Sequence, residues 1–311
     1  MKSRATEFLV CPRCTGQLDL AEATTNGTEI MDGMLTCPPC DARYPIRGGV
    51  PRFVQNGRYA ESFGYEWSLF KAVQLDAANR TSESEDAFRE QTGWTRPDIE
   101  GALVLDAGVG AGRYADVVSH WGGEVVGVDL TSAVDSAFEN VGRRERVHLV
   151  QADLFAMPFR PGTFQVAFSI GVLHHTPDPA LAFNKVAQTI RRGGQMAIYV
   201  YPAIGLARHS SDVIRRVATR LPLPVMYWMS ALAIPLYYPY RLPVLGRVLQ
   251  TLLPVSPHPN WRWRWLNTFD WYTPKYQFKL TYPEVFRWFK TAGFVDIDVL
   301  EIAICMRGVK A

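Results

Sequence analysis

A turn rich in glycine lies between two acidic residues near the middle of this chain. An apolar run ends at Asp106, and a second apolar run ends at Asp129. Between them, glycines occupy alternate positions, Gly108, Gly110 and Gly112. Glycine lets the backbone adopt positive φ angles and approach a bound molecule closely. An acid at the end of a strand can bind ribose hydroxyls. The pattern predicts a nucleoside-cofactor site at the carboxyl edge of a parallel sheet.

The charge of this turn separates two kinds of cofactor. Residues 110–115 fit the dinucleotide fingerprint G-x-G-x-x-G/A, although that match alone is weak. A dinucleotide turn presents backbone amides to a pyrophosphate, whereas Asp106 suits an ammonium group and repels a phosphate. The turn more closely resembles D-x-G-x-G-x-G, the first motif of class I S-adenosylmethionine (SAM) methyltransferases. This resemblance implies SAM as the cofactor.

The same resemblance extends over roughly residues 101–202. It implies that Asp153, after a third strand, meets the adenine amino group, and that the backbone of the next residue meets the ring. A fourth strand then runs from Phe164 into the active-site loop. The cofactor-binding residues that the resemblance implies are Asp106, Gly108, Gly110, Gly112, Asp129, Leu130, Asp153, Leu154, Ser169 and Gly171.

Two adjacent histidines follow the fourth strand, where an acceptor would meet the methyl group. Methyl transfer is an in-line displacement on a sulfonium methyl, so an enzyme aligns the nucleophile and removes a proton from a hydroxyl or an acidic carbon. Histidine suits that task because its pKa lies near neutrality. We predict that His174 or His175 acts as the base, with His174 favoured, and that the other shapes the loop. Catalysis by positioning alone is the alternative.

Four of the five cysteines form two C-x-x-C pairs, Cys11 with Cys14 and Cys37 with Cys40. Two such turns complete a tetrahedral shell of four thiolates around zinc. A hairpin tip at residues 26–27 accounts for the distance between the pairs. Protein ligands fill all four positions, so the predicted zinc is structural and not catalytic.

The cysteine-rich segment also resembles a family of small proteins. With the flanking residues 44–46 and 49–51, it resembles the zinc-ribbon activators of tRNA, rRNA and protein methyltransferases. Those activators cover an apolar face of a methyltransferase, and here one would be fused to its enzyme. The charged start of the chain does not resemble a signal peptide. We therefore expect a cytoplasmic protein, in which cysteines are more often metal ligands than disulfides.

These motifs require an α/β fold to position them. We expect the Rossmann-like sheet of class I methyltransferases, with seven strands and the last one antiparallel. Residues 1–54 would form a zinc-ribbon domain, and residues 55–311 a methyltransferase domain with an insertion at 203–275. Helices are expected at 83–91 and 282–292, and the last two strands at 295–302 and 305–309.

The insertion is expected to form a helical lid. Residues 221–240 carry no charge and could in principle cross a bilayer, but prolines leave only residues 225–234 uninterrupted. An interfacial segment at 221–256, with nearby arginines meeting anionic lipid, is the alternative. Both interpretations favour an apolar or amphipathic acceptor. Further on, Trp261, Trp263 and Trp265 would share one face if extended, or would pack inward.

The loop after the fourth strand argues for a small acceptor. Methyltransferases that act on exocyclic amines of bases usually carry Asn/Asp-Pro-Pro-Tyr there, whereas this chain has Ser-Ile-Gly-Val at 169–172. It resembles the small-molecule O- and C-methyltransferases, such as the ubiquinone and menaquinone group. The expected function is SAM-dependent methyl transfer to an O or C nucleophile of an apolar or aromatic molecule, such as a natural product, lipid or quinone. The candidate substrate residues are Tyr65, Trp67, Asp270, Tyr272 and Tyr276.

Two other functions remain open at this point. The first is a base methyltransferase of rRNA or tRNA that uses the zinc ribbon to bind RNA. The net charge of +3 is too small to imply nucleic-acid binding by itself. The second is a non-catalytic partner subunit, against which the complete set of Asp106, Asp129 and Asp153 argues.

Overall fold

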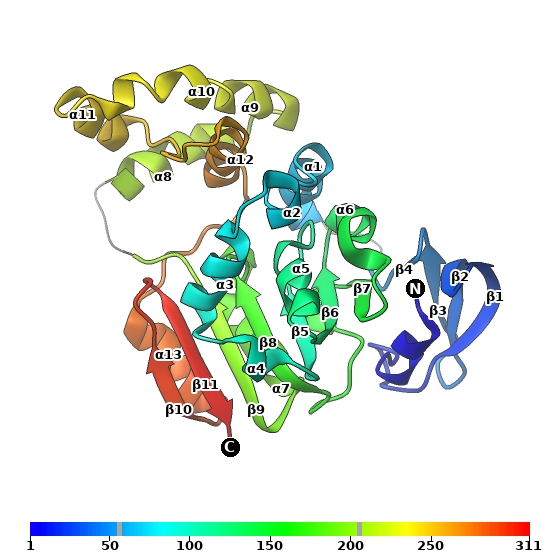
Figure 1. Cartoon of the computed structure of the whole chain (residues 1–311). Helices are drawn as coiled ribbons and strands as arrows, with labels where there is room; N and C mark the ends of the chain where they lie inside the picture. The colour runs from blue at the N-terminus through cyan, green and yellow to red at the C-terminus, as the bar shows by residue number, and fades with distance from the viewer. Residues whose placement is uncertain (55–57, 204–206) are drawn as a thin grey trace.

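Two β-sheets organise the chain (Figure 1). The computed structural model describes residues 1–54, 58–203 and 207–311. Within this part, the smaller sheet comprises β1 (Asp19–Asn26), β2 (Glu29–Cys37), β3 (Ala42–Arg47) and β4 (Val50–Pro51), in that order. Neighbouring strands are antiparallel. The tip between β1 and β2 contains Gly27 at a φ of +63°, which confirms the predicted hairpin.

The larger sheet has the predicted seven strands within the described residues. They are β5 (Leu103–Ala107), β6 (Glu124–Asp129), β7 (Val147–Gln151), β8 (Phe164–Ile170), β9 (Ile190–Tyr199), β10 (Phe294–Val299) and β11 (Cys305–Lys310). Their order is β10-β11-β9-β8-β5-β6-β7. Strands β5 to β9 are parallel, and β11 is antiparallel to both of its neighbours. The predicted reversal of the last strand is therefore confirmed.

Helices cover both faces of this sheet. Because successive side chains of a strand point to opposite faces, Val104 packs into one apolar core and Leu105 into the other. Phe88 of α3 belongs to the first core, and Phe183 of α7 to the second. The helices are α1 (Glu61–Leu69), α2 (Asp76–Asn79), α3 (Glu83–Thr92), α4 (Arg96–Ile99), α5 (Arg113–His120), α6 (Ala133–Ala137), α7 (Pro179–Gln188), α8 (Ala207–Ala218), α9 (Leu223–Ser230), α10 (Ala233–Leu236), α11 (Leu245–Leu252), α12 (Trp261–Tyr272) and α13 (Tyr282–Thr291). The described residues also include 3₁₀ or π turns, at η1 (Ser3–Glu7), η2 (Arg58–Ala60), η3 (Phe138–Gly142), η4 (Leu154–Ala156), η5 (Leu173–His175) and η6 (Pro239–Arg241).

The small sheet and its flanking residues, 1–54, form the ribbon, which packs against the β7 edge of the large sheet (Figure 1). The backbone N–H of Phe53 donates to the carbonyl of Gln151 at 2.8 Å, and an Arg52 guanidinium N–H donates to the side-chain oxygen of the same glutamine at 3.0 Å. The Phe8 ring lies 5.2 Å from His148. Buried residues of the ribbon and the sheet share one apolar core. The predicted boundary after residue 54 adjoins 55–57, which lie outside the described residues.

The insertion folds as short helices over the carboxyl ends of the strands (Figure 1). Its predicted start adjoins 204–206, which also lie outside the described residues. The uncharged stretch 221–240 divides into α9, α10 and η6. None of the described helices combines the length and the apolar character needed to cross a bilayer. The tryptophan-rich stretch forms the first turns of α12, so its three indoles do not share the face that an extended strand would give them. Trp263 is buried, whereas Trp261 is exposed.

Candidate functional site

A cavity of about 290 Å³ opens at the carboxyl edge of β5, β6 and β8. The turn after β5 and the end of β6 form one side of it, and side chains of α1 and α12 line another. Helix α1 can approach closely because Gly64 has no side chain: a Cβ there would lie 2.8 Å from the Ser132 hydroxyl oxygen. The Ser136 hydroxyl then donates to the carbonyl of Trp67 at 2.9 Å.

The glycine turn has the geometry that the sequence predicts. Gly108 adopts a φ of +102°, and a Cβ there would lie 2.2 Å from a methyl carbon of Val172. The N–H of Gly110 donates to Asp129 Oδ2 at 3.0 Å. Asp129 Oδ1 accepts from the N–H and hydroxyl of Thr131 at 2.9 and 2.8 Å. Burial raises the pKa of the Asp129 carboxyl, and the bonds from Thr131 oppose that shift. The turn thus holds this carboxylate on the cavity wall.

The cavity wall includes some of the predicted cofactor residues and excludes others. On the wall are Gly108, Gly110, Asp129, Leu130, Leu154 and Gly171. Those outside it are Asp106, Gly112, Asp153 and Ser169. Ser169 is fully buried, and its hydroxyl donates to the carbonyl of Ala107 at 2.8 Å. Asp153 lies just behind the wall, because its Oδ1 accepts at 3.2 Å from the hydroxyl of Tyr59, which does line the cavity.

Asp106 requires a correction. The sequence suggests that it meets an ammonium group, but the structure places it behind the glycine turn and not on the wall. It is 2% exposed, and its Oδ2 has no hydrogen-bond partner among the described residues. Burial raises its pKa well above the usual range, and the charge of Asp129 adds to the shift. A buried acid beside a second acid favours the protonated form.

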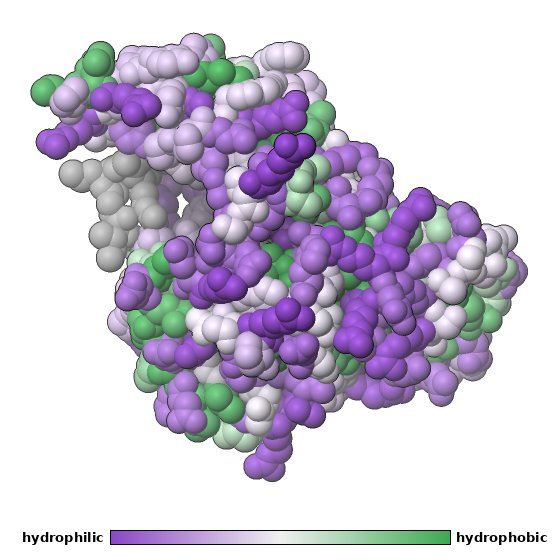
Figure 2. All heavy atoms as spheres, viewed as in Figure 1, coloured by the Kyte–Doolittle hydropathy of each residue, from purple (hydrophilic) through white to green (hydrophobic). Residues whose placement is uncertain are grey.

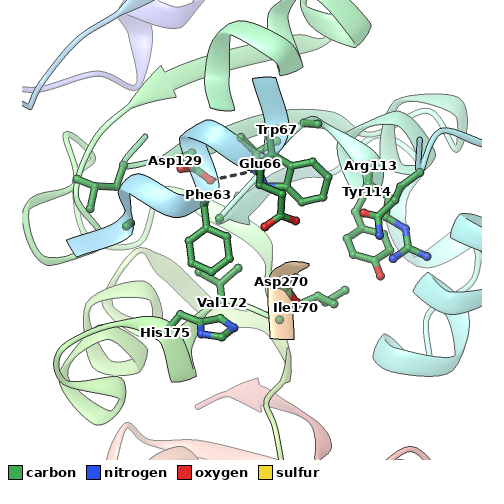
Figure 3. A pocket seen from close by; sticks show the side chains of 18 of the residues that line it. Phe63, Glu66, Trp67, Arg113, Tyr114, Asp129, Ile170, Val172, His175 and Asp270 are labelled. Atoms are coloured by element: carbon green, nitrogen blue, oxygen red, sulfur yellow. Dashed lines mark hydrogen bonds between the residues drawn. The ribbon is translucent and has the colours of Figure 1, made fainter. Parts of the chain in front are cut away.

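The rest of the wall is mainly apolar and aromatic (Figure 3). Phe63 of α1, Val172 after β8 and Leu266 of α12 lie on it. Of the five predicted substrate residues, Trp67 and Asp270 line the cavity. The other three point elsewhere or use only their backbone: Tyr65 packs near Phe269, the Tyr272 hydroxyl donates to the carbonyl of Pro254, and the carbonyl of Tyr276 faces His175.

The two histidines occupy different positions. His175 lines the cavity, whereas His174 is fully buried between the rings of His175 and Tyr201, at 4.1 and 4.0 Å. The prediction that His174 faces the acceptor is therefore wrong, because η5 turns that ring into the core. His175 Nδ1 lies 2.8 Å from the Tyr276 carbonyl oxygen and so carries the hydrogen, which leaves Nε2 as an acceptor. Burial lowers the pKa of His175 to about 4.

A pair of acidic side chains on the wall was only half predicted. Glu66 of α1 and Asp270 of α12 both line the cavity, and in Figure 3 the Glu66 carboxylate points toward the side where Asp270 lies. Glu66 is 1% exposed, and its Oε2 has no hydrogen-bond partner among the described residues. Asp270 Oδ2 accepts from the Tyr201 hydroxyl at 3.2 Å. The sequence offers one clue to a role for Glu66, because it is the single acidic residue in the aromatic run at 63–67.

The environment of this pair shifts both pKa values upward. Burial raises the pKa of Asp270 to about 6, although the Tyr201 bond and the charge of Arg215 oppose the shift. Burial raises the pKa of Glu66 well above its usual range, and the negative charge of Asp270 adds to this. Two carboxyl groups in one dry site do not ionise together. The pair therefore retains one proton near neutral pH and leaves one carboxylate on the wall.

The four predicted metal ligands meet in the ribbon. The sulfur atoms of Cys11, Cys14, Cys37 and Cys40 all lie within 4.8 Å of one another. Three of the pairs are 3.4 to 3.6 Å apart. Tetrahedral zinc with bonds of about 2.3 Å requires sulfur separations of about 3.8 Å. The donor set and its spacing fit a structural zinc ion. Cys305 is buried elsewhere, in β11.

Comparison with known families agrees with both parts of this architecture. Residues 105–198 match the model of a methyltransferase domain, and residues 2–49 match the model of the Trm112p-like proteins. The chain carries a class I methyltransferase domain preceded by a Trm112-like zinc ribbon. The methyltransferase match covers the glycine turn and the parallel strands from β5 to β9.

Individual relatives resemble parts of the chain. A ubiquinone biosynthesis O-methyltransferase of Thiobacillus denitrificans is 34% identical over 105 residues, which are 32% of this chain and 44% of that protein. A probable tRNA methyltransferase 9B of Mus musculus is 32% identical over 104 residues, which are 32% of this chain and 22% of that protein. The chain thus spans less than half the length of these curated relatives.

Among solved structures, a complex of the Haloferax volcanii Trm112 activator with a putative methyltransferase is 13% identical, with a TM-score of 0.48. That match covers 79% of this chain and 96% of the other.

Proposed function

We propose that this protein transfers a methyl group from SAM to an O or C nucleophile of a small apolar or aromatic molecule. One observation carries the proposal. A single cavity joins the glycine turn and Asp129 of the methyltransferase domain to an apolar wall that also holds a carboxyl pair. A cofactor and an acceptor could therefore lie in contact within one cavity.

The cofactor side of the cavity fits SAM. Asp129 would accept hydrogen bonds from the ribose hydroxyls, and Gly108 and Gly110 leave room for the backbone to approach the ligand. Leu130 and Leu154 offer apolar contact for the adenine ring. When bound there, SAM supplies an electrophilic methyl group on a sulfonium. Asp106 supports the turn from behind and does not contact the ligand.

We propose that the carboxyl pair receives the proton of the acceptor. A base works best when its pKa lies near the working pH. The pKa of Asp270, about 6, is closer to neutrality than the pKa of His175, about 4. As the acceptor oxygen or carbon forms its new bond, its proton would pass to the Asp270 carboxylate. His175 would position the acceptor through Nε2.

A transfer assay tests the proposed function. The protein is incubated with SAM labelled in the methyl group, together with phenolic and quinol acceptors, membrane lipids and bulk RNA in separate reactions. We expect label in an organic-extractable small molecule. Label that appears only in RNA would reject the small-molecule acceptor.

The RNA alternative draws on the Trm112-like match and on the tRNA methyltransferase relative. The charge of the ribbon argues against it, because residues 1–54 contain six basic and six acidic residues. A phosphate-binding surface normally concentrates positive charge. Filter binding to tRNA and rRNA at two salt concentrations distinguishes the cases. Tight binding that weakens steeply with salt would support the RNA function.

A further inference from the structure

The insertion exposes an unusual amount of apolar surface. The six most exposed large apolar side chains among the described residues all belong to it: Val213, Val217, Trp228, Tyr238, Val244 and Leu252, each at least 60% exposed. Figure 2 shows apolar residues at the surface over the α11 end of the insertion. Soluble proteins seldom expose large contiguous apolar patches unless the patch meets another surface.

The exposed residues follow helical periodicity. On α11, Leu245, Val248 and Leu252 are spaced by three and four residues, so they lie on one face of the helix, and all three are exposed. On α8, Val213 and Val217 are one turn apart and also exposed. An amphipathic helix normally turns such a stripe toward the core. Here the stripes face outward.

Positive charge dominates the same segment, since the acidic residues of 203–275 are Asp212, which pairs with Lys279, and Asp270 on the cavity wall. Between Val213 and Phe269 the sequence contains seven arginines and no aspartate, glutamate or lysine. Five of these arginines are exposed: Arg216, Arg220, Arg241, Arg247 and Arg262. The whole chain has a net charge of only +3. Exposed apolar stripes combined with arginines that outnumber the acidic residues match the chemistry of a lipid surface that carries phosphate groups.

Helix α12 connects this surface to the cavity. Helix α12 contributes Leu266, Asp270 and Trp271 to the cavity wall. The same helix packs against α9, where the Trp265 indole N–H donates to the Tyr227 carbonyl at 2.8 Å. The insertion therefore carries both a part of the cavity wall and the exposed apolar side chains.

We propose that the insertion binds the surface of an anionic membrane. The apolar stripes of α8 and α11 and the side chain of Trp228 would enter the boundary between headgroups and acyl chains, and the exposed arginines would contact lipid phosphates. Because α12 links the insertion to the cavity wall, the acceptor would be a hydrophobic or amphipathic molecule drawn from the lipid phase. This last step rests on the proposed methyl-transfer function, whereas membrane binding does not.

Vesicle sedimentation with the full chain tests the proposal. Vesicles of phosphatidylcholine are compared with vesicles that also contain phosphatidylglycerol, at low and high salt. We expect binding to the anionic vesicles that weakens with salt. Each of Arg241→Glu and Arg247→Glu should reduce partitioning at least about fivefold, since one arginine near an anionic surface contributes that factor. Trp228→Glu should reduce it further. Val299→Glu, on exposed β10, is the matched control and should bind like wild type.

Three results would overturn the proposal: no binding of wild type to anionic vesicles, equal binding by all the variants, or a dimer in light scattering that Trp228→Glu dissociates. The last would assign the face to a second copy of this chain. Methyl transfer to a water-soluble acceptor is measured in parallel. If the wild type transfers methyl groups but does not bind vesicles, only the membrane-binding proposal is rejected. If it binds vesicles but transfers no methyl group, only the proposed methyl-transfer function is rejected.

Discussion

The ribbon and the insertion flank the same catalytic sheet, but they use apolar residues in opposite ways. In the ribbon, Leu35 and Ile46 are buried, and Leu20 is the only large apolar side chain of residues 1–54 that ranks as exposed. In the insertion, outward-facing apolar stripes cover α8 and α11. A small domain that buries its apolar residues against the sheet needs no further surface. A helical segment whose apolar face stays outside does need one.

The two regions also differ in how they attach to the sheet. The ribbon is joined to the sheet by backbone hydrogen bonds to β7, by a shared core and by the ion pair between Arg4 and Glu124 of β6. The insertion attaches mainly through α12, which also forms part of the cavity wall. Within the described residues, one addition therefore stabilises the edge of the sheet and the other shapes the site. Four experiments test this contrast.

The largest effect is expected from removing the metal of the ribbon. Cys37→Ser should lose the zinc, and the stability of the ribbon with it, because structural zinc sites supply roughly 10 kcal/mol or more of apparent binding energy. Elemental analysis and thermal unfolding measure the two quantities. Cys305→Ser is the control, since that thiol lies outside the cluster. If the Cys37→Ser protein contains no metal and still unfolds at the wild-type temperature, the zinc has no structural role.

On the insertion side, Asp270→Asn should lower kcat by about a hundred- to ten-thousandfold, because it removes the proposed proton acceptor. SAM affinity should stay unchanged. The carboxylate is the active form and its pKa is about 6, so wild-type activity should fall as the pH drops below about 6. A kcat–pH profile measures this. If the profile is flat between pH 5 and 7, as a rough range around that pKa, the assignment fails. Glu66→Gln should leave the profile in place, because the pKa of the Glu66 carboxyl is raised well above its usual range and the group is already uncharged while Asp270 titrates.

The third experiment concerns Asp129, which lies on the sheet between the two regions. Asp129→Ala should weaken SAM binding about ten- to a hundredfold, since a lost hydrogen bond to a charged group costs roughly 1.5–3 kcal/mol. Isothermal calorimetry measures the change. Asp135→Ala removes an exposed acid that pairs with Arg52, and it should leave the affinity as it is. Tight binding of NAD by the wild type would contradict the cofactor assignment.

The smallest effects compare one arginine from each region. Arg52→Ala should lower the free energy of unfolding by about 1 kcal/mol, because that side chain bonds Gln151 and pairs with half-exposed Asp135. Arg241→Ala should not change the stability measurably, since the residue is exposed in the insertion, but it should weaken binding to anionic vesicles. Denaturant titration and vesicle sedimentation give the two values. Equal stability losses would show that both regions are held in the same way.

Features whose chemistry is local could be predicted from the residue types and their spacing alone. The glycine turn must be glycine because its backbone conformation and close contacts exclude a Cβ, as Gly108 shows. The C-x-x-C pairs place two thiolates on one turn whatever surrounds them. The apolar strands ending in Asp106 and Asp129 fixed the parallel sheet and its carboxyl edge. For these, residue type and spacing carry the physical constraint.

The tertiary structure decided what distant segments do to one another. Adjacent histidines differ only because η5 turns His174 into the core and His175 toward the cavity. Asp106 lies behind its turn because the start of α5 covers it, and Ala115 there donates a backbone hydrogen bond to it. Glu66 and Asp270 meet only because α1 and α12 pack together over the sheet. Burial and charge coupling depend on such packing, and a sequence motif does not contain it.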